Sequence, residues 1–361
     1  MAAYALRRLL LILPTLFGIL LINFVIIQAA PGGPVEKAIA RLQGLGDGGM
    51  AMSTGGDMAG AAHATGPGGH GAARGLDPEL VAEIRHQYGF DQSPAQRFWK
   101  MIRDYAHGDL GNSFFRDQSV LSLIKEKMPV SLSLGLWSTL LIYLIAIPLG
   151  IAKARRAGSR FDVWTSGVII VAYAIPAFLL ALLLIILFAG GSYWQWFPMQ
   201  GLTSENFAEL SFGGKLIDYA RHMVLPTLCL TVGSLATLTL FTRNSFLEEL
   251  QKPYVLTARA KGASERRVLF GHVFRNAMLI LIAGLPATLF GLLFTGAFLI
   301  EVIFNLDGLG LLSYESVINR DYPVVFGTLF LFTLMGMILR LVGDLCYRLV
   351  DPRIDFSQAD V

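Results

Sequence analysis

The sequence predicts an all-α integral membrane protein, with six transmembrane helices and a large external loop subdomain after the first of them. Of its 361 residues, 54% are hydrophobic and 15% are charged, and the mean hydropathy is +0.57. Soluble globular chains of this size contain fewer apolar and more charged residues. The apolar residues are also concentrated in runs long enough for an α-helix to cross a hydrocarbon core of about 30 Å.

The first apolar run covers residues 9–30 and follows Arg7 and Arg8. A cleaved signal peptide has a shorter apolar core, so we interpret residues 1–30 as a retained transmembrane helix; cleavage after Ala29-Ala30 is the alternative. A five-helix core is expected over residues 130–350, followed by a tail over 351–361. The spans of this core are expected near residues 130–152, 161–188, 222–243, 277–304 and 324–350.

Five prolines fall within the expected spans: Pro14, Pro148, Pro176, Pro226 and Pro286. Each removes a backbone hydrogen bond and is expected to kink or loosen its helix. Kinked helices suit a gated pathway, but they occur in membrane proteins of every function.

Basic residues are distributed unevenly between the loops that join the spans. They cluster at 153–160 and 259–275, whereas the two short outer loops contain only Lys215, Arg221 and Arg320. The positive-inside rule then places the basic loops and both termini in the cytosol.

Residues 31–129 form the longest polar segment and are expected to lie outside. Between 44 and 75 the segment contains mostly Gly, Ala, Met, Ser, Thr and His, so it has little to bury and is expected to be flexible. Two capped helices are expected after it, one from Asp77-Pro78 to Gly89 and one from Ser93-Pro94 to Gly108. The second has an apolar stripe made of Phe98, Met101, Ile102 and Tyr105.

A polar loop over residues 246–276 interrupts the apolar second half of the chain. Pro253 is expected to begin a short helix, because backbone N–H groups in the first turn have no partner within the helix and a proline there loses no hydrogen bond. Gly262 is expected to end the helix in the left-handed conformation. Ser264 is a typical N-cap for a second helix, with Glu265 in its first turn. One face of this second helix is expected to hold Val268, Leu269, His272 and Val273.

The first helix of this loop has one side of small residues, which lets another protein approach the backbone. Those residues are Thr257, Ala258, Ala260, Gly262 and Ala263, and long basic side chains surround them: Arg259, Lys261, Arg266, Arg267 and Arg275. An ordinary positive-inside loop is the alternative interpretation.

The run TARAKG at 257–262, followed by HVFRNA at 272–277, resembles the cytoplasmic coupling loop of ATP-binding-cassette importer permeases for peptide uptake. Leu256 and Arg275 depart from the general loop pattern, in which an acidic residue and a proline are usual, and match the variant of the peptide subgroup. The resemblance implies docking on an ATPase subunit through nine residues: Thr257, Ala258, Arg259, Ala260, Lys261, Gly262, Ala263, Arg275 and Asn276.

The resemblance covers the whole chain except the glycine-rich segment. It includes GDLGNS at 108–113, LIEVIFNLDGLGLL at 299–312, INRDYPVV at 318–325 and DPRIDF at 351–356. The sequences of these motifs are most similar to those of the microcin C and oligopeptide uptake permeases of the Yej type. The resemblance therefore implies a multi-pass permease subunit of a bacterial inner membrane that translocates peptides or peptide-like compounds.

Four kinds of partner follow from the resemblance: ATPase subunits, a second homologous permease subunit, an external substrate-binding protein and membrane lipid. The external subdomain would help to receive the binding protein; a packed cap over the helix ends is the alternative. Peptides and nickel both remain as substrates at this point, because the specificity-bearing partner is a separate chain.

Charged residues within the expected spans are few, and each requires a reason because a charge in the bilayer is costly. The resemblance places Glu301, Arg320 and Asp321 in the outer gate region. A pairing of Glu301 with Arg320, or an interfacial position, is the alternative to substrate contact. Arg340 and Asp344 are four residues apart on one helix and are expected to neutralise each other.

Motifs for nucleotide binding, catalysis and metal binding are absent from the sequence. The run Gly213-Gly214-Lys215 lacks P-loop spacing, no H-E-x-x-H or G-x-S-x-G occurs, and no Cys or carboxylate cluster accompanies His63 and His70. We expect no enzymatic activity, no cofactor or metal, no nucleic-acid partner, and ATP hydrolysis on a separate subunit.

Two alternatives come from other functional classes. An ion- or proton-driven secondary transporter acting without an ATPase would need titratable groups near the bilayer midplane, and the sequence has almost none. A receptor or scaffold built on the outer segment would leave the coupling loop unexplained.

Overall fold

The computed structural model describes residues 2–29, 86, 91–191, 193–294 and 298–350. Within these ranges the regular elements are helices, and the only β-pairing is an isolated bridge between Asn112 and Ser119. The all-α prediction is thus confirmed. The predicted flexible coil at 44–75, the predicted helix at 77–89 and the tail at 351–361 lie outside the described residues.

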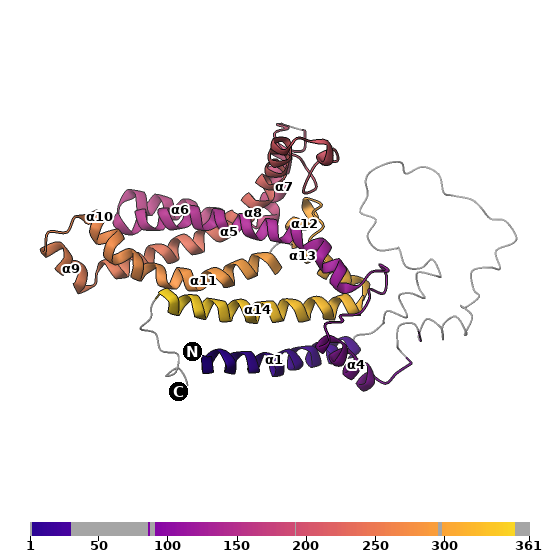
Figure 1. Cartoon of the computed structure of the whole chain (residues 1–361). Helices are drawn as coiled ribbons and strands as arrows, with labels where there is room; N and C mark the ends of the chain where they lie inside the picture. Colours follow the sequence, from indigo (N-terminus) through magenta and orange to yellow (C-terminus); the bar gives the residue numbers. More distant parts are fainter. Residues whose placement is uncertain (1, 30–85, 87–90, 192, 295–297, 351–361) are drawn as a thin grey trace. The chain divides into compact units, whose positions relative to one another are not determined.

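Figure 1 shows the order of the helices along the chain. Their bounds are α1 Ala2–Ala29, α4 Pro94–Ala106, α5 Val120–Arg155, α6 Arg160–Ala174, α7 Ala177–Phe188, α8 Phe212–Leu250, α9 Pro253–Ala260, α10 Glu265–Arg267, α11 Phe274–Phe294, α12 Phe298–Ile303, α13 Leu309–Asn319 and α14 Tyr322–Val350, with a 3₁₀ turn at Phe207–Glu209 and a π-helix at Val268–Val273.

The chain divides into two compact units. The first unit contains residues 1–16, 122–314 and 330–361, and the second contains residues 17–121 and 315–329. The first unit carries the loop that the sequence marks as a docking site.

Five helices among the described residues are long and apolar enough to cross a membrane. The spans are Leu6–Ala29, Val120–Arg155, Phe212–Leu250, Glu265–Gly291 and Tyr322–Cys346. Helices α6 and α7 pass the same test only as a pair, which is bent and has the form of a broken span or of a re-entrant loop. The chain is therefore a multi-pass membrane protein, and the predicted count of six holds when the bent pair is counted as one span.

The third predicted span is not straight. Its two parts, α6 and α7, meet at 92°, with Ile175 in an extended conformation and Pro176 before the first turn of α7. The residue before a proline is driven out of the helical region, which explains the break. The other four prolines, Pro14, Pro148, Pro226 and Pro286, remain inside helices.

Two of the spanning helices are longer than the sequence indicated. Helix α5 has 36 residues and α8 has 39, or about 54 and 58 Å at 1.5 Å per residue, well beyond a hydrocarbon core of about 30 Å. Residues 120–129 were expected in the external subdomain, before the second span. They form the beginning of α5 instead. Within the fifth predicted span, α11 extends to Phe294 and Glu301 lies on α12, and residues 295–297 between them lie outside the described residues.

The second unit is organised around α4. Ser93 caps this helix through a reciprocal capping box with Gln96, and Phe98 packs against Phe17 and Phe24 at ring distances of 5.6 and 5.2 Å. Gly108 has a φ of +79° and ends the helix, as predicted. Of the predicted stripe, Phe98 and Tyr105 are buried and Met101 and Ile102 are half-buried.

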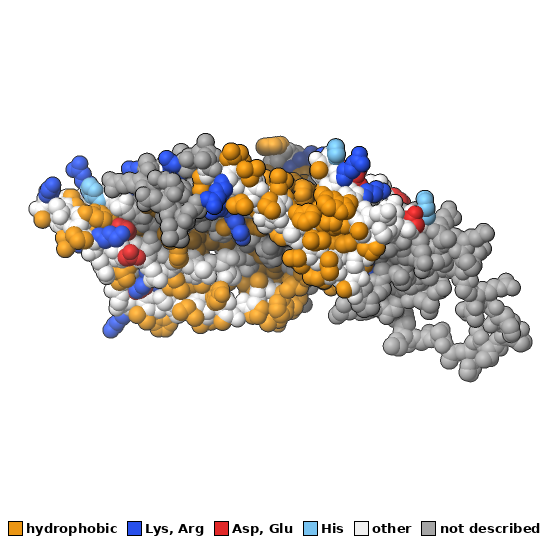
Figure 2. All heavy atoms as spheres, turned by 90° about the horizontal axis from the view of Figure 1, so that it is seen from below, with side chains coloured by type: hydrophobic (Ala, Val, Ile, Leu, Met, Phe, Trp, Pro, Cys, Tyr) orange, Lys and Arg blue, Asp and Glu red, His pale blue; other side chains and the backbone are white. Residues whose placement is uncertain are grey.

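Apolar side chains cover much of the face seen in Figure 2, and Lys and Arg gather at its left end, where the first unit carries α9 and α10. That end has its own apolar core. Its buried members are Ala154, Phe246, Val255, Val268, Leu269, Val273, Ala277, Met278 and Leu281.

Candidate functional site

The predicted docking loop begins with helix α9, which has the capping predicted from its sequence. Pro253 occupies the first turn and Gly262 has a φ of +80°. The Gly262 N–H donates to the Arg259 carbonyl at 2.9 Å, and the Ala263 N–H donates to the Ala258 carbonyl at 3.1 Å. These two bonds form a Schellman motif, which needs a left-handed residue at the Gly262 position.

The turn after α9 is closed by an N-cap and an ion pair. The Ser264 hydroxyl accepts from the Arg267 N–H at 3.4 Å. Arg259 donates two hydrogen bonds to the Glu265 carboxylate, at 2.8 and 3.1 Å. This pair raises the pKa of Arg259 above its ordinary value, chiefly through the hydrogen bonds from its guanidinium.

The second helix of the loop departs from the prediction. The α-helical part, α10, has three residues, and the chain then forms a π-helix over Val268–Val273 that continues directly into α11. Val268, Leu269 and Val273 are buried as expected, but His272 is exposed, so its predicted place on the apolar face is wrong. The wider π turn shifts the residues that follow Leu269 around the helix axis.

Apolar contacts and one polar chain hold α9 on the ends of α8 and α11. Val255 and Phe246 are fully buried, and the Phe246 ring packs at 5.9 Å against Phe274. The Tyr254 hydroxyl donates to the Glu249 carboxylate at 2.7 Å. Burial, followed by the Glu249 carboxylate, raises the pKa of Tyr254 to about 12, so this hydroxyl remains a donor at neutral pH.

Asn276 extends this polar chain to α11. Its amide donates to the Tyr254 hydroxyl at 3.3 Å, and nearby the Ser245 hydroxyl of α8 donates to the Ala277 carbonyl at 2.8 Å. Asn276, predicted as a coupling residue, therefore connects the loop to the membrane helix behind it.

The nine predicted docking residues, Asn276 included, belong to this loop of the first unit. Seven of the nine are exposed and two are half-buried: Thr257, Arg259, Ala260, Lys261, Gly262, Arg275 and Asn276, and then Ala258 and Ala263. Leu256 beside them is 61% exposed. The surface they present is small, basic and partly apolar.

A buried ion cluster near the loop was not predicted, because the sequence analysis assigned its basic residues to solvated cytosolic loops. Lys153 of α5 is fully buried, with its ammonium 3.1 Å from the Asp162 carboxylate of α6. Arg243 of α8 binds the same carboxylate, and the Thr165 and Ser166 hydroxyls accept from Lys153 at 2.8 and 2.7 Å. One sequence pattern could have indicated this cluster: Ser159, the N-cap of α6, is followed three positions later by Asp162 and then by the hydroxyl residues Thr165 and Ser166.

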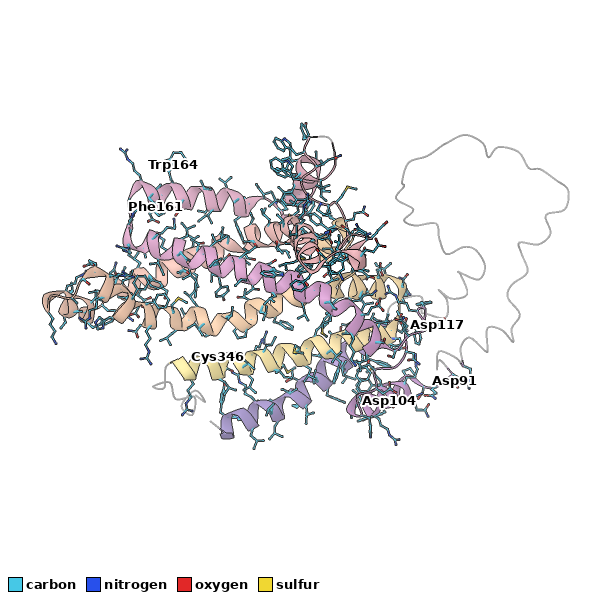
Figure 3. All side chains as sticks on the ribbon, turned by 45° about the horizontal axis from the view of Figure 1, so that its top comes forward. Asp91, Asp104, Asp117, Phe161, Trp164 and Cys346 are labelled. Carbon is cyan, nitrogen blue, oxygen red and sulfur yellow. The ribbon has the colours of Figure 1, made fainter. Side chains whose placement is uncertain are left out.

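Aromatic residues surround the start of α6. Phe161 lies 5.5 Å from the Arg156 guanidinium, and Trp164 is 72% exposed and points away from the neighbouring helices (Figure 3). Exposed tryptophan is typical of the boundary between hydrocarbon and headgroups. This exposure favours a position of the start of α6, and of the ion cluster beside it, near the boundary of the membrane.

Of the three predicted gate residues, Glu301 belongs to the first unit and is not at a position that reaches water. It is fully buried in the first unit, where its carboxylate accepts from the Ser131 hydroxyl at 3.2 Å and the Leu311 N–H at 2.7 Å. Ser131 also accepts from the Leu309 N–H at 2.8 Å. The carboxylate thus lies at the N-terminus of α13, where the helix dipole favours a negative charge.

Arg320 and Asp321 belong to the second unit. Arg320 is in the left-handed region, with a φ of 59°. Asp321 is buried and accepts hydrogen bonds from the Ser113 hydroxyl and from the Phe114 N–H, the latter at 3.0 Å. Within their own units, Glu301 and Asp321 therefore each hold together segments that are apart in the sequence.

The expected pairing of Arg340 with Asp344 is wrong. Asp344 forms an ion pair of 2.9 Å with Arg8 of α1 and accepts from the Tyr4 hydroxyl at 3.2 Å. The spacing of four residues allowed a pair within α14, but Arg8 supplies a closer cation from the neighbouring helix.

Comparison with known protein families covers the part of the chain that contains this loop. Residues 146–356 match the family described as "Binding-protein-dependent transport system inner membrane component". The chain belongs to this family. The match spans the ion cluster, the loop and the segment with Glu301.

Similar proteins extend the family match to the whole chain. The inner membrane ABC transporter permease protein YejB of Escherichia coli O157:H7 is 57% identical over 363 residues, which cover 99% of this chain and 100% of that protein. The peptidoglycan transport system permease protein YejB of Agrobacterium fabrum is 55% identical over 364 residues, covering 100% of both. The oligopeptide transport system permease protein AppB of Bacillus subtilis is 32% identical over 365 residues, covering 99% and 100%.

This protein is therefore the permease subunit of an ATP-binding-cassette importer, and its ATPase is a separate subunit. It is an inner-membrane component that works with a substrate-binding protein, so the alternatives of a lone secondary transporter and of a scaffold are set aside.

Proposed function

We propose that this permease translocates peptides or peptide-like compounds and that the loop around α9 couples the movement to ATP hydrolysis. The names of the relatives support the substrate class, since they refer to oligopeptide, dipeptide and peptidoglycan transport. Peptides are therefore preferred to nickel, and microcin C-like compounds are one form of the proposed cargo.

The single observation that carries the coupling proposal is the rigid path from α9 to two membrane helices. The exposed residues around Gly262 would contact the ATPase, while Tyr254 links α9 to Glu249 on α8 and to Asn276 on α11. A displacement of α9 would then move both helix ends. The docking surface consists of the nine predicted residues, Thr257, Ala258, Arg259, Ala260, Lys261, Gly262, Ala263, Arg275 and Asn276.

A cavity of about 500 Å³ between α5, α6, α8 and α11 supports the substrate class. Five of its lining residues carry a hydroxyl group, Tyr143, Tyr173, Ser234, Thr237 and Thr288, and none of its described lining residues is charged. Hydroxyls can exchange hydrogen bonds with a peptide backbone without selecting the charge of the side chains. We assign this cavity to the translocation path, and selectivity to the external binding protein.

The proposed arrangement has both termini in the cytosol, which follows from the positive-inside rule. Residues 1–30 form the first span, 31–129 the external subdomain with its glycine-rich insertion at 44–75, 130–350 the permease core and 351–361 a cytosolic tail. The remaining partners are a second homologous permease subunit, ATPase subunits and a substrate-binding protein. We assign Glu301, Arg320 and Asp321 to the support of the outer gate, without substrate contact.

The test is a detergent pull-down of tagged protein at native expression, followed by reconstitution of the co-purified subunits and the binding protein in liposomes. We expect an ATPase and a second permease to co-purify, and labelled oligopeptide to enter only with ATP. Uptake by the lone chain down an ion gradient would overturn the proposal.

A matched pair of glycine substitutions tests the coupling role. Gly108 ends α4 with the same pair of Schellman hydrogen bonds and nearly the same φ as Gly262, and neither has a neighbour within 4 Å of an added Cβ. Gly262→Ala and Gly108→Ala should therefore introduce similar backbone strain, of about 1–2 kcal/mol. Only Gly262→Ala should reduce ATPase co-purification; equal losses in the two variants would contradict the docking assignment.

A further inference from the structure

We propose that a hollow between α1, α11 and α14 binds the phosphate group of an anionic phospholipid through Arg340. The hollow has a volume of about 250 Å³. Arg8, Arg340 and Asp344 supply its charged groups, and Pro286, Ala287 and Leu339 are among its apolar walls. All of these residues belong to the first unit.

The charges in the hollow do not balance. Asp344 is satisfied by the Arg8 guanidinium at 2.9 Å and by the Tyr4 hydroxyl at 3.2 Å. Arg340 is exposed and has no hydrogen-bond or ion-pair partner within the part of the chain that the structure describes. One positive charge is therefore left over, which matches the single negative charge of a phosphodiester.

The depth of Arg340 in the membrane makes this charge costly without a partner. Arg340 lies ten residues before the end of α14, or about 15 Å along the helix axis. Helix α14 has 29 residues and is about 43 Å long, so it extends only about 7 Å beyond each face of a hydrocarbon core of about 30 Å. The Cα of Arg340 would then lie below the headgroups, and its long side chain can reach them by snorkelling.

The surroundings favour a lipid over free inorganic phosphate. The helices that flank the hollow present apolar side chains to the membrane, with Leu9 47% and Leu13 68% exposed on α1 and Val342 40% exposed on α14. Acyl chains can pack against these side chains while the phosphate meets Arg340. Helices α14 and α11 approach each other closely at Gly343, where an added Cβ would lie 3.2 Å from the Ala283 carbonyl, and both residues line the hollow.

Basic pockets between transmembrane helices are a recognised form of anionic headgroup site. The leaflet concerned is the one that meets the N-terminal end of α1, which is the cytosolic leaflet in the proposed topology. Lipid binding itself does not depend on that topology or on the transported substrate.

The test is native mass spectrometry of the intact transporter, extracted from nanodiscs of equal phosphatidylglycerol and phosphatidylcholine. We expect wild-type protein to retain phosphatidylglycerol preferentially and Arg340→Gln to reduce the preference about fivefold, as expected for one arginine near the surface. Arg340→Lys should keep most of it. The control is Arg160→Gln, which removes an exposed arginine at the start of α6 and should reduce the preference less than Arg340→Gln does; an equal reduction would assign the effect to surface charge in general.

Asp344→Asn gives a prediction of opposite sign, which a merely unstable variant could not imitate. It frees Arg8 from its ion pair, so the retained phosphatidylglycerol should increase. Unchanged retention in both Arg340→Gln and Asp344→Asn would overturn the proposal.

A protection assay distinguishes the sources of the anion. Phosphatidylglycerol nanodiscs should slow phenylglyoxal modification of Arg340 relative to phosphatidylcholine nanodiscs. Equal protection by inorganic phosphate in phosphatidylcholine would replace the lipid with a free anion. Protection in pure phosphatidylcholine that appears only in the assembled transporter would assign Arg340 to a carboxylate of another subunit.

Discussion

Arg243 donates two hydrogen bonds to the Asp162 carboxylate, from Nε at 2.9 Å and from Nη2 at 2.7 Å. The Lys153 ammonium lies 3.1 Å from the same carboxylate, and the Gly158 N–H donates to it at 3.1 Å. Helices α5, α6 and α8 thus meet at one buried anion. Removing the shared carboxylate would leave the buried Lys153 charge uncompensated.

Asp162→Ala should therefore destabilise the protein by about 3–5 kcal/mol, because Lys153 is left buried without a counterion. Arg243→Gln should have a smaller effect, since Lys153 still neutralises Asp162 and Arg243 is 22% exposed. Thermal unfolding in detergent measures both. The double variant Lys153→Met with Asp162→Leu removes both charges and should be more stable than Asp162→Ala alone; additive losses would contradict the cluster.

The exposed pair Arg259–Glu265 is expected to matter for docking and not for folding. The two side chains are 39% and 64% exposed, and ion pairs of this kind add little to stability. Arg259→Ala should leave thermal unfolding nearly unchanged but weaken the co-purification of the ATPase.

Glu265→Ala is the matched control for that prediction, because it breaks the same ion pair and leaves the guanidinium in place. It should preserve ATPase binding if Arg259 contacts the ATPase directly. Equal loss in the two variants would mean that the pair only orders the turn.

The sequence predicted best where one residue determines the local backbone. Gly262, Ser264 and Ser93 act through their own conformations or through bonds to residues three positions away, and each occupies the predicted place. The straightness of the third span was not predictable in the same way. A proline inside a helix either kinks it or ends it, and packing selects between a retained helix at Pro226 and a 92° break at Pro176.

Charged pairs were predicted worst, because their partners are distant in the sequence. Asp344 pairs with Arg8, 336 positions away, instead of with Arg340 on its own helix. Asp162 and Arg243 come from helices whose contact no local pattern reveals. Periodicity and capping identify helices, whereas the choice of ion-pair partner depends on how the helices pack.

Gly308→Ala should destabilise the segment that holds Glu301. An added Cβ would lie 2.5 Å from the Glu301 Cδ, so the carboxylate would have to give up its bonds from Ser131 and Leu311. We expect a loss of about 1–3 kcal/mol in thermal unfolding experiments. Adding Glu301→Asp to this variant shortens the acidic side chain and should recover part of the lost stability. The control is Gly213→Ala, where the added Cβ has no neighbour within 4 Å, and it should be neutral or slightly stabilising.

Asp321 is expected to make the second unit less stable at neutral than at acidic pH. Burial raises the pKa of its carboxyl above the ordinary value, although hydrogen bonds from Ser113 and the Phe114 N–H oppose that rise. The folded state therefore binds the proton more tightly than the unfolded state. The stabilisation is complete below the ordinary pKa of about 3.9 and is lost as the pH rises through the higher folded-state value, by at most about 1.4 kcal/mol per pH unit.

Asp321→Asn removes this titration and keeps the geometry, since the amide oxygen can accept from the Phe114 N–H and the amide nitrogen can donate to the Ser113 hydroxyl. The variant should match the wild type near pH 4 and exceed it at pH 7 in hydrogen-exchange protection of α4 and residues 110–114. Lower protection of the variant than of the wild type at pH 7 would contradict this and would show that the ionised carboxylate holds Ser113 and Phe114. In that case Asp321 would act as a fixed anion within the second unit, and its burial would not limit stability at neutral pH.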